Sequence, residues 1–529
     1  MIWNRFQRSE KGLALIFVTI TLPAIIGFSL LAIDGARVYN LHNDLQKAAD
    51  AFALTAAAEL DGLPDQKIRA QRAVKDLVDN FSRFSTSGTF TLTDADIAPL
   101  RFLKEIPAND DIMDAMGRVP AGAPYDSLTD TDAPFVEVTV NPTDLNTIFP
   151  ASFLGGSDIA TLDATAVAGF TSGVCDFTPI YICNPYEGAL GGPGDPTLFE
   201  AATLRSERRK MIELRQQGGN ACQNGPGNYG FLENPLGNGA PALRNALAMA
   251  NPPICYSSRG VEVSTGFIAT VRDALGVRFD MYNGPMGGKK NDPLFRPAKS
   301  VRKGFDPGAS ACNQIEVPPP DPDDITTRQY MGLPRDNNML HNNCADGRIG
   351  DGHWDFMKYM KVNHGDVVAA GATSYTNRDG VVWTDWPPGP GEIHPTRYEV
   401  YLEELYADPS IIDNPSGQHA MSGGLPDPPA RPEIGSPACY SGGAGSLSND
   451  PDRRLLYGAI LDCVTYAADL VGGSGNEIPV TAFVSFFLIE PVESSGGNQN
   501  IRVELVDITG QGGQGTLETF SRDDVQLYR

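Results

Sequence analysis

An uncharged stretch of 21 residues near the start of the chain, residues 13–33, constrains the fold more than any other feature. As an α-helix it extends about 31 Å, close to the thickness of bilayer hydrocarbon. A cleaved secretory signal would be shorter and end in a small-residue cleavage site, and none follows here. Because Arg5, Arg8 and Lys11 precede the stretch, the positive-inside rule places the N-terminus in the cytoplasm. We therefore predict a single span, with the chain exported from about Asp34 onward.

Composition narrows the class of protein that the exported part can be. The chain has 529 residues, 41% of them hydrophobic, which is enough for two or more packed domains. Its formal net charge is −24, so the phosphate backbone of a nucleic acid would repel it. We expect no nucleic-acid partner.

Eight cysteines follow the apolar stretch, and none stands in a CxxC motif. An even number on the exported side is typical of structural disulfides in an oxidising compartment. Spacing does not choose among the 105 pairings of eight cysteines. We expect four bonds between neighbours, with no cysteine free. The expected pairs are Cys175–Cys183, Cys222–Cys255, Cys312–Cys344 and Cys439–Cys463.

The N-terminal third is expected to form a long helix and a small sheet. The apolar periodicity and the alanine-rich segment 48–58 continue the first helix to about Leu60, and residues 64–81 form a second helix. Alternating apolar residues then predict strands at 89–93, 135–140 and 163–170.

From residue 171 onward, glycine, proline and asparagine become frequent, which indicates long loops between regular elements. We predict helices at 197–217, 240–250 and 453–470, strands at 478–492 and 500–508, and a strand–helix–strand unit over 260–282. The fold class expected is α+β: a membrane helix that continues as a pilin-like helix with a small β-sheet, then a larger mixed α/β domain with irregular insertions.

Several motifs together resemble the TadE/TadG-like proteins of the Flp (Tad, type IVc) pilus system. The shared features are basic residues before Gly12, an apolar run with Leu22-Pro23, then Asp34-Gly35-Ala36-Arg37 and "LQKAADAFALTAAA". The segments 135–170, 452–463, 480–492 and 522–529 are also similar to this family, and the last three resemble its large TadG type.

The resemblance implies a component of pilus assembly that is anchored in the bacterial inner membrane and faces the periplasm. It implies boundaries of 1–12 for a cytoplasmic tail, 13–33 for the span, 34–170 for the pilin-like helix and sheet, and 171–529 for the cysteine-containing domain. Other Tad pilus assembly proteins or pseudopilins are the expected partners. Ala49, Ala53 and Ala56 are expected to pack against either such a partner or the protein's own sheet.

One departure from pilins favours an uncleaved anchor over a fibre subunit. Pilin precursors have a glutamate at the fifth position after the processed glycine, and here Phe17 follows Gly12 at that position. A chain cleaved after Gly12 would bury a new ammonium group without its carboxylate partner.

Searches for catalytic and metal motifs lead to no assigned site. The Asp-x-Ser-x-Ser motif of von Willebrand A-like domains is missing, so such a domain would be a degenerate, metal-free one. We interpret the acidic loop 346–355 as a turn and Cys344, near His341, as a disulfide cysteine. The basic segment 289–304 is expected to be a solvated loop, with contact to an acidic partner or to an acidic surface of the same protein as the alternative. We expect no enzyme, no cofactor and no metal. A calcium-dependent adhesin or binding module and a periplasmic enzyme remain the alternatives.

Overall fold

The computed structural model divides the chain into two compact units. The first unit is Met1–Ser172 with Asp523–Arg529, and the second is Gly173–Arg522. The residues that the structure describes are 10–61, 65–79, 92–107, 112–114, 118–129, 133–187, 196–216, 224–237, 239–257, 260–264, 271–304, 331–340, 348–364, 368, 371–406, 435–443, 447, 452–472, 477–492, 499–509, 516–517 and 520–528.

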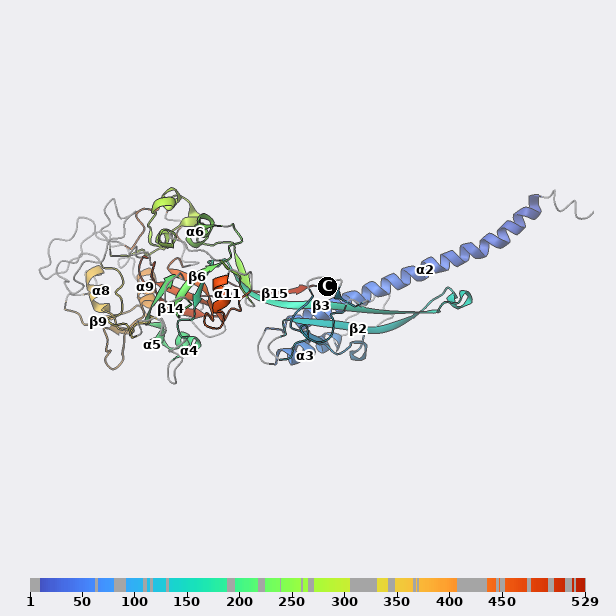
Figure 1. Ribbon diagram of the computed structural model, residues 1–529, viewed down its shortest axis with the longest axis horizontal. Coiled ribbons are helices and arrows are strands. Elements are labelled where there is room, and N and C mark those ends of the chain that lie inside the picture. Colours follow the sequence, from blue (N-terminus) through green and yellow to red (C-terminus); the bar gives the residue numbers. More distant parts are fainter. Residues whose placement is uncertain are drawn as a thin grey trace, which may run out of the picture. The chain divides into compact units, whose positions relative to one another are not determined.

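The first unit is a long helix, α2 (Glu10–Ala57), with a small sheet packed on its C-terminal half. Figure 1 shows the hairpin of β2 and β3 running beside this helix. The sheet order is β1-β2-β3-β15, with β1–β2 and β2–β3 antiparallel. The remaining elements of the unit are α3 (Gln66–Asp79), β1 (Arg101–Leu103), β2 (Phe135–Asn146), β3 (Ile159–Cys175) and β15 (Ser521–Leu527).

Alternation along the strands explains how helix and sheet pack. Val136, Val138 and Val140 of β2 are fully buried. The alternation of apolar residues predicts that these three side chains share one face of a strand. They meet the alanine-rich part of α2 and the α3 side chains Ala70 and Val74 in one hydrophobic cluster. Small alanines let the helix backbone approach the sheet closely. The predicted strand at 89–93 lies mostly outside the described residues, and its last two residues are not in a strand.

The second unit is built on a ring of six strands. The order β4-β12-β13-β14-β5-β6 closes because β4 pairs with both β12 and β6. Two pairings, β4–β12 and β5–β6, are parallel, and the other four are antiparallel. The strands of the ring are β4 (Ile180–Cys183), β5 (Met211–Gln216), β6 (Asn228–Leu232), β12 (Leu455–Leu461), β13 (Ala482–Leu488) and β14 (Ile501–Ile508).

Short elements surround the ring. The helices are α4 (Leu198–Thr203), α5 (Arg205–Arg208), α6 (Ala240–Ala248), α7 (Val271–Gly276), α8 (Phe356–Asn363), α9 (Arg397–Tyr406) and α11 (Ala467–Gly472). The strands outside the ring are β7 (Cys255–Ser257), β8 (Val263–Ser264), β9 (Ser374–Thr376), β10 (Val382–Thr384) and β11 (Glu392–Ile393).

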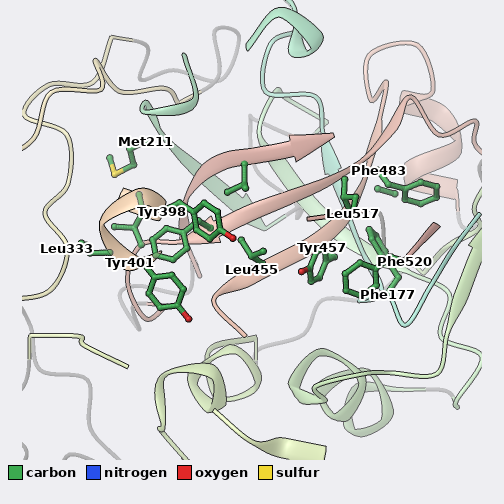
Figure 2. Packing of buried hydrophobic residues seen from close by; sticks show 14 of the residues in the cluster. Phe177, Met211, Leu333, Tyr398, Tyr401, Leu455, Tyr457, Phe483, Leu517 and Phe520 are labelled. Carbon is green, nitrogen blue, oxygen red and sulfur yellow. The ribbon is translucent and has the colours of Figure 1, made fainter. Parts of the chain in front are cut away.

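The two faces of the ring strands belong to different hydrophobic clusters. Ile180, Ile212 and Leu456 lie in one, with side chains of α4, α6 and α7. Tyr457 and Phe483 lie in the other, where the rings of Phe177 and Phe520 join them, as Figure 2 shows. Both faces being apolar, these strands carry near-continuous hydrophobic runs.

That double burial explains one wrong prediction. The segment expected as a helix over 453–470 is the strand β12, followed by the short helix α11. All seven residues of β12 are buried, so no polar face marks its period. Gly458 also fits the strand, since a Cβ there would come within 2.6 Å of the Ile182 side chain on neighbouring β4.

Two further predictions in this unit are corrected. The helix expected over 197–217 ends at Arg208, and Met211–Gln216 form β5, where Ile212 and Leu214 pair with Val503 and Ile501 of β14. The strand expected after α7 is a 3-10 turn, Val277–Phe279. The predicted helix at 240–250 and the strands at 478–492 and 500–508 are confirmed as α6, β13 and β14. The architecture is α+β, as expected.

Candidate functional site

The N-terminal part of α2 is an exposed apolar surface. Of the described residues, this helix alone is long and apolar enough to cross a membrane. Its large apolar side chains from Leu15 to Ile33 are 48–74% exposed, and Phe17 is 67% exposed. Leaving so many large apolar groups in water is unfavourable, so the surface indicates a hydrophobic partner. The exposed side chains are Leu15, Ile16, Phe17, Val18, Ile20, Leu22, Ile25, Ile26, Phe28, Leu31 and Ile33.

Polar groups on this surface are satisfied within the helix. The hydroxyls of Thr19, Thr21 and Ser29 each donate to the carbonyl four residues earlier, at 2.7, 2.7 and 2.8 Å. In a bilayer no water is present to satisfy such groups, so internal hydrogen bonds are required. The surface therefore suits lipid chemically as well as by length.

Asp34 ends the exposed surface and ties the helix to the sheet hairpin. It is only 4% exposed, and its carboxylate accepts the backbone N–H of Ile148 at 2.8 Å and of Phe149 at 2.6 Å. These two N–H groups lower the pKa of Asp34, and Arg37 lowers it further. The Nη1 group of Arg37 donates to the Asp34 carboxylate and to the Asn146 carbonyl, both at 3.1 Å. We call these five residues the clasp.

The hairpin tip beyond the clasp is also apolar. Ile148 is 51% exposed, and the ring of Phe149 lies 3.6 Å from where a Cβ of Gly27 would stand. The 3-10 turn Ala151–Leu154 closes the tip, and Gly155 follows it with a φ of 83°, which glycine adopts without strain. The tip thus lies beside the exposed part of α2.

Beyond the clasp, α2 is buried in its own unit. Ala49, Ala53 and Ala56 are fully buried, in the cluster that holds Val138 of β2 and Ala166 of β3. Gln46 adds a hydrogen bond to the Thr165 carbonyl at 3.2 Å. These three alanines are therefore buried within the first unit, in a cluster that holds side chains of both the sheet and α3.

Residues 12–59 match the family model described as "Putative Flp pilus-assembly TadE/G-like". The chain carries a TadE/G-like domain. The match covers 48 of the 529 residues, from position 12 to position 59, and the length of the chain is consistent with the large TadG type. Neither the curated proteins nor the solved structures contain a match to the chain.

The TadE/G-like segment contains one half of the clasp. Asp34 and Arg37 lie inside the matched residues, and Asn146, Ile148 and Phe149 lie outside them. The Asp34-Gly35-Ala36-Arg37 motif, which carried the resemblance, therefore has a structural explanation. It supplies the carboxylate and guanidinium that hold the hairpin at the end of the apolar surface.

Neither the clasp nor the hairpin tip was predicted from the sequence. A signal was present, because an apolar turn rich in aromatic residues stands between Asp144 and Asp158 with no charged residue between them. Turns are usually polar, so apolar residues there are informative.

The disulfides differ from the neighbour pairing that we expected. Cys175 bonds Cys255 across the paired strands β3 and β7, with a Cα–Cα distance of 3.9 Å. Cys183 bonds Cys463, joining the ends of the parallel neighbours β4 and β12. The expected pairs Cys175–Cys183, Cys222–Cys255 and Cys439–Cys463 are therefore wrong. Strand pairing, not closeness in sequence, brings these thiols together.

Four cysteines remain besides these two bonded pairs. Cys439 is disulfide-bonded, and none of the described cysteines is free. The expected pair Cys312–Cys344 and Cys222 lie outside the described residues.

The acidic loop predicted as a turn is held by local hydrogen bonds. Asp351 accepts the N–H of His353 and the amide of Asn338, both at 2.9 Å. No group of three metal-ligating side chains occurs among the residues that the structure describes. His341 and Cys344 lie outside them.

The basic segment 289–304 is solvated only in part. Lys299 is exposed, as expected of a solvated loop. Arg302 is 3% exposed and lies 3.5 Å from the Glu404 carboxylate, which is an acidic group of the same protein. Lys303 donates to the Phe279 carbonyl at 3.0 Å, and Lys289 lies over the ring of Phe295.

A buried ion-pair network sits beside β14. The guanidinium of Arg397 donates to Asp336 at 2.6 Å and to Glu504 at 2.7 Å, and all three side chains are essentially unexposed. Asp336 also accepts the N–H of Met211 and of Gly352. Since backbone donors and the guanidinium occupy these carboxylates, the network joins α9, β14 and β5 structurally.

Proposed function

We propose that the protein is an inner-membrane-anchored, periplasm-facing component of a Flp (Tad) pilus assembly system. The observation that carries the proposal is the coincidence of the TadE/G-like match with the exposed apolar half of α2. Residues 13–33 would span the bilayer once, residues 1–12 would stay in the cytoplasm, and the pilin-like part 34–170 and the cysteine-containing domain 171–529 would face the periplasm.

Three observations support the orientation, the span and the compartment, in that order. Lys11 and the arginines before it precede the apolar stretch. The helix hydroxyls are satisfied internally. The disulfides Cys175–Cys255 and Cys183–Cys463 suit an oxidising compartment such as the periplasm.

The role proposed is structural, and its partners are other Tad pilus assembly proteins or pseudopilins. The family description names pilus assembly and no reaction. Ala49, Ala53 and Ala56 are buried within the first unit, which supports partner contacts through other surfaces of that unit. We propose no catalytic role.

The first experiment tests anchoring with a matched pair of variants. Leu22 is 53% exposed in the middle of the proposed span, and Leu128 is 88% exposed in a loop of the same unit. Lysine near the centre of a span costs about 3 kcal/mol in insertion. Leu22→Lys should therefore shift the full chain out of the carbonate-resistant membrane fraction, and Leu128→Lys should leave it there. Native chain extracted by carbonate would disprove the anchor.

The second experiment tests the role. Deletion of the gene should remove pili from cells that make them, and the native chain supplied in trans should restore them. Leu22→Lys should restore fewer pili than Leu128→Lys. Unchanged pilus number in the deletion strain would refute an assembly function.

A further inference from the structure

The tip of the β2–β3 hairpin, residues 147–154, has the position, composition and hydrogen bonding of a second membrane-contacting element. We propose that it inserts into the periplasmic half of the bilayer that α2 spans. The inference rests on the proposed membrane anchoring and adds a second contact with lipid to it.

Position is the first argument. The tip is fixed to α2 by the clasp at Asp34, and its Phe149 ring contacts α2 at Gly27. Gly27 precedes Ile33, the last residue of the uncharged stretch, by six positions, which is about 9 Å along the helix axis. When residues 13–33 span the bilayer, a group that touches Gly27 lies below the level of the lipid headgroups.

Composition is the second argument. Residues 145–157 include no Asp, Glu, Lys or Arg, and the tip contains Ile148, Phe149, Phe153 and Leu154. Ile148 is 51% exposed, and the large apolar side chains in the N-terminal part of α2 are exposed as well. Aromatic and aliphatic side chains in a loop next to a membrane helix suit the interface between headgroups and acyl chains.

Hydrogen bonding is the third argument. A loop enters hydrocarbon only when its backbone polar groups are satisfied by the protein. Here Asp34 accepts the N–H of Ile148 and Phe149, and Asp158 accepts the N–H and the hydroxyl of Ser152 at 2.7 and 2.5 Å. Four further backbone N–H groups at the tip donate to carbonyls of the hairpin itself: Thr147 to Asp158, Ala151 to Phe149, Gly155 to Ser152 and Gly156 to Ala151.

The charged pair of the clasp, Asp34 and Arg37, lies where such an arrangement needs it. Asp34 is paired with Arg37, and both follow the uncharged stretch, at the level of the headgroups. Insertion at two points, the helix and the loop held at its side, would fix the rotation of α2 about its axis and the depth of the first unit in the bilayer. A single helix leaves that rotation free.

Accessibility of a spin label tests the inference on the full chain. The label is placed through a genetically encoded ketone amino acid, so the disulfides stay intact, at position 148, 25 or 128. The chain is reconstituted alone in vesicles of phosphatidylethanolamine and phosphatidylglycerol, so no partner protein can shield a site. Collision with oxygen, which concentrates in lipid, is compared with collision with a water-soluble nickel chelate.

The expected result is that the labels at 25 and 148 collide with oxygen in preference to the chelate, and that the label at 128 does the opposite. A label at 148 that behaves like the one at 128, while 25 remains in lipid, would overturn the inference and leave the anchor intact. Labels at both 25 and 148 exposed to the chelate would overturn the anchor, and the inference with it.

Discussion

The carboxylate of Asp34 accepts the backbone N–H of Phe149 at 2.6 Å, across 115 residues of sequence. This contact joins the point where α2 stops being apolar and exposed to the tip of the hairpin that packs beside it. The family motif around Asp34 thus acts on a segment outside the matched residues.

Removing the Asp34 carboxylate should release the hairpin tip. We expect Asp34→Ala to speed amide hydrogen exchange at Ile148 and Phe149, because both N–H groups lose their acceptor. Asp144 is on the same hairpin and accepts the Thr161 hydroxyl, a bond outside the tip, so Asp144→Ala is the control. Equal exchange at the two amides in both variants would mean that the clasp does not hold the tip.

The protection that Asp34 gives to these two amides should depend on pH, and the direction follows from its pKa. The pKa of Asp34 is lowered in the folded chain, so its stabilising effect is complete above the ordinary carboxyl pKa of 3.8 and is lost only as pH falls through the lower folded value. Protection of the two amides should therefore persist at pH 4.5. Loss of protection already near pH 6 would contradict the assignment.

Overpacking the buried half of α2 should destabilise the first unit. Ala53 is fully buried against the sheet, and Leu at this position should lower the free energy of unfolding by about 1–3 kcal/mol. Ala36→Leu, on an exposed part of the same helix, is the control. Denaturant unfolding in detergent measures both, and pilus number should fall for Ala53→Leu while membrane insertion persists. Identical unfolding curves for the two variants would contradict the close packing of Ala53.

Local periodicity was sufficient for part of this fold and insufficient for the rest. The alternating valines of β2 and the alanine-rich part of α2 each have one buried face, so their period is visible in the sequence. Residues 455–461 have two buried faces, so helix and strand were indistinguishable there. The clasp and the two disulfides depend on pairings 80 or more residues apart, which no local pattern encodes.

His394 should make the second unit sensitive to mild acid. Burial lowers its pKa from 6.5 to about 4, and the nearby cations Arg209 and Arg397 act in the same direction. Its Nδ1–H donates to the Thr384 carbonyl at 2.8 Å. Because the unfolded chain binds the proton more readily, stability is complete above pH 6.5 and falls by about 2 kcal/mol between pH 7 and pH 5.

The variant His394→Gln isolates that effect. Its amide can still donate toward Thr384, but it does not titrate. The difference in unfolding free energy between pH 7 and pH 5 should be smaller in the variant by about 2 kcal/mol. An unchanged difference would assign the acid sensitivity to other groups.

The two located disulfides should contribute unequally. Cys183–Cys463 closes a loop of 280 residues and Cys175–Cys255 one of 80. In the chain-entropy model the longer loop contributes about 1 kcal/mol more. The double variant Cys183→Ser with Cys463→Ser should therefore unfold at lower denaturant than Cys175→Ser with Cys255→Ser. The reverse order would mean that native-state effects outweigh loop entropy.

A thiol count provides the accompanying check. We predict four disulfides in the exported protein, so no thiol should be alkylated before reduction and eight should be alkylated after it. Intact mass of the native chain reads both numbers. Two or more thiols labelled without reduction would contradict the prediction.

The chain should stay full length in the membrane, without cleavage at Gly12. Phe17 occupies the position where pilins have a glutamate, and it is 67% exposed on an uncharged helix surface. Cleavage after Gly12 would create an ammonium group in that surface with no carboxylate to pair it, which is unfavourable in hydrocarbon. Intact mass of the membrane-extracted protein should therefore correspond to a start before Gly12, the same for the native chain and for Gly12→Val. A native chain that starts at Leu13, with Gly12→Val retaining the extension, would establish processing at Gly12 and make the protein a fibre subunit.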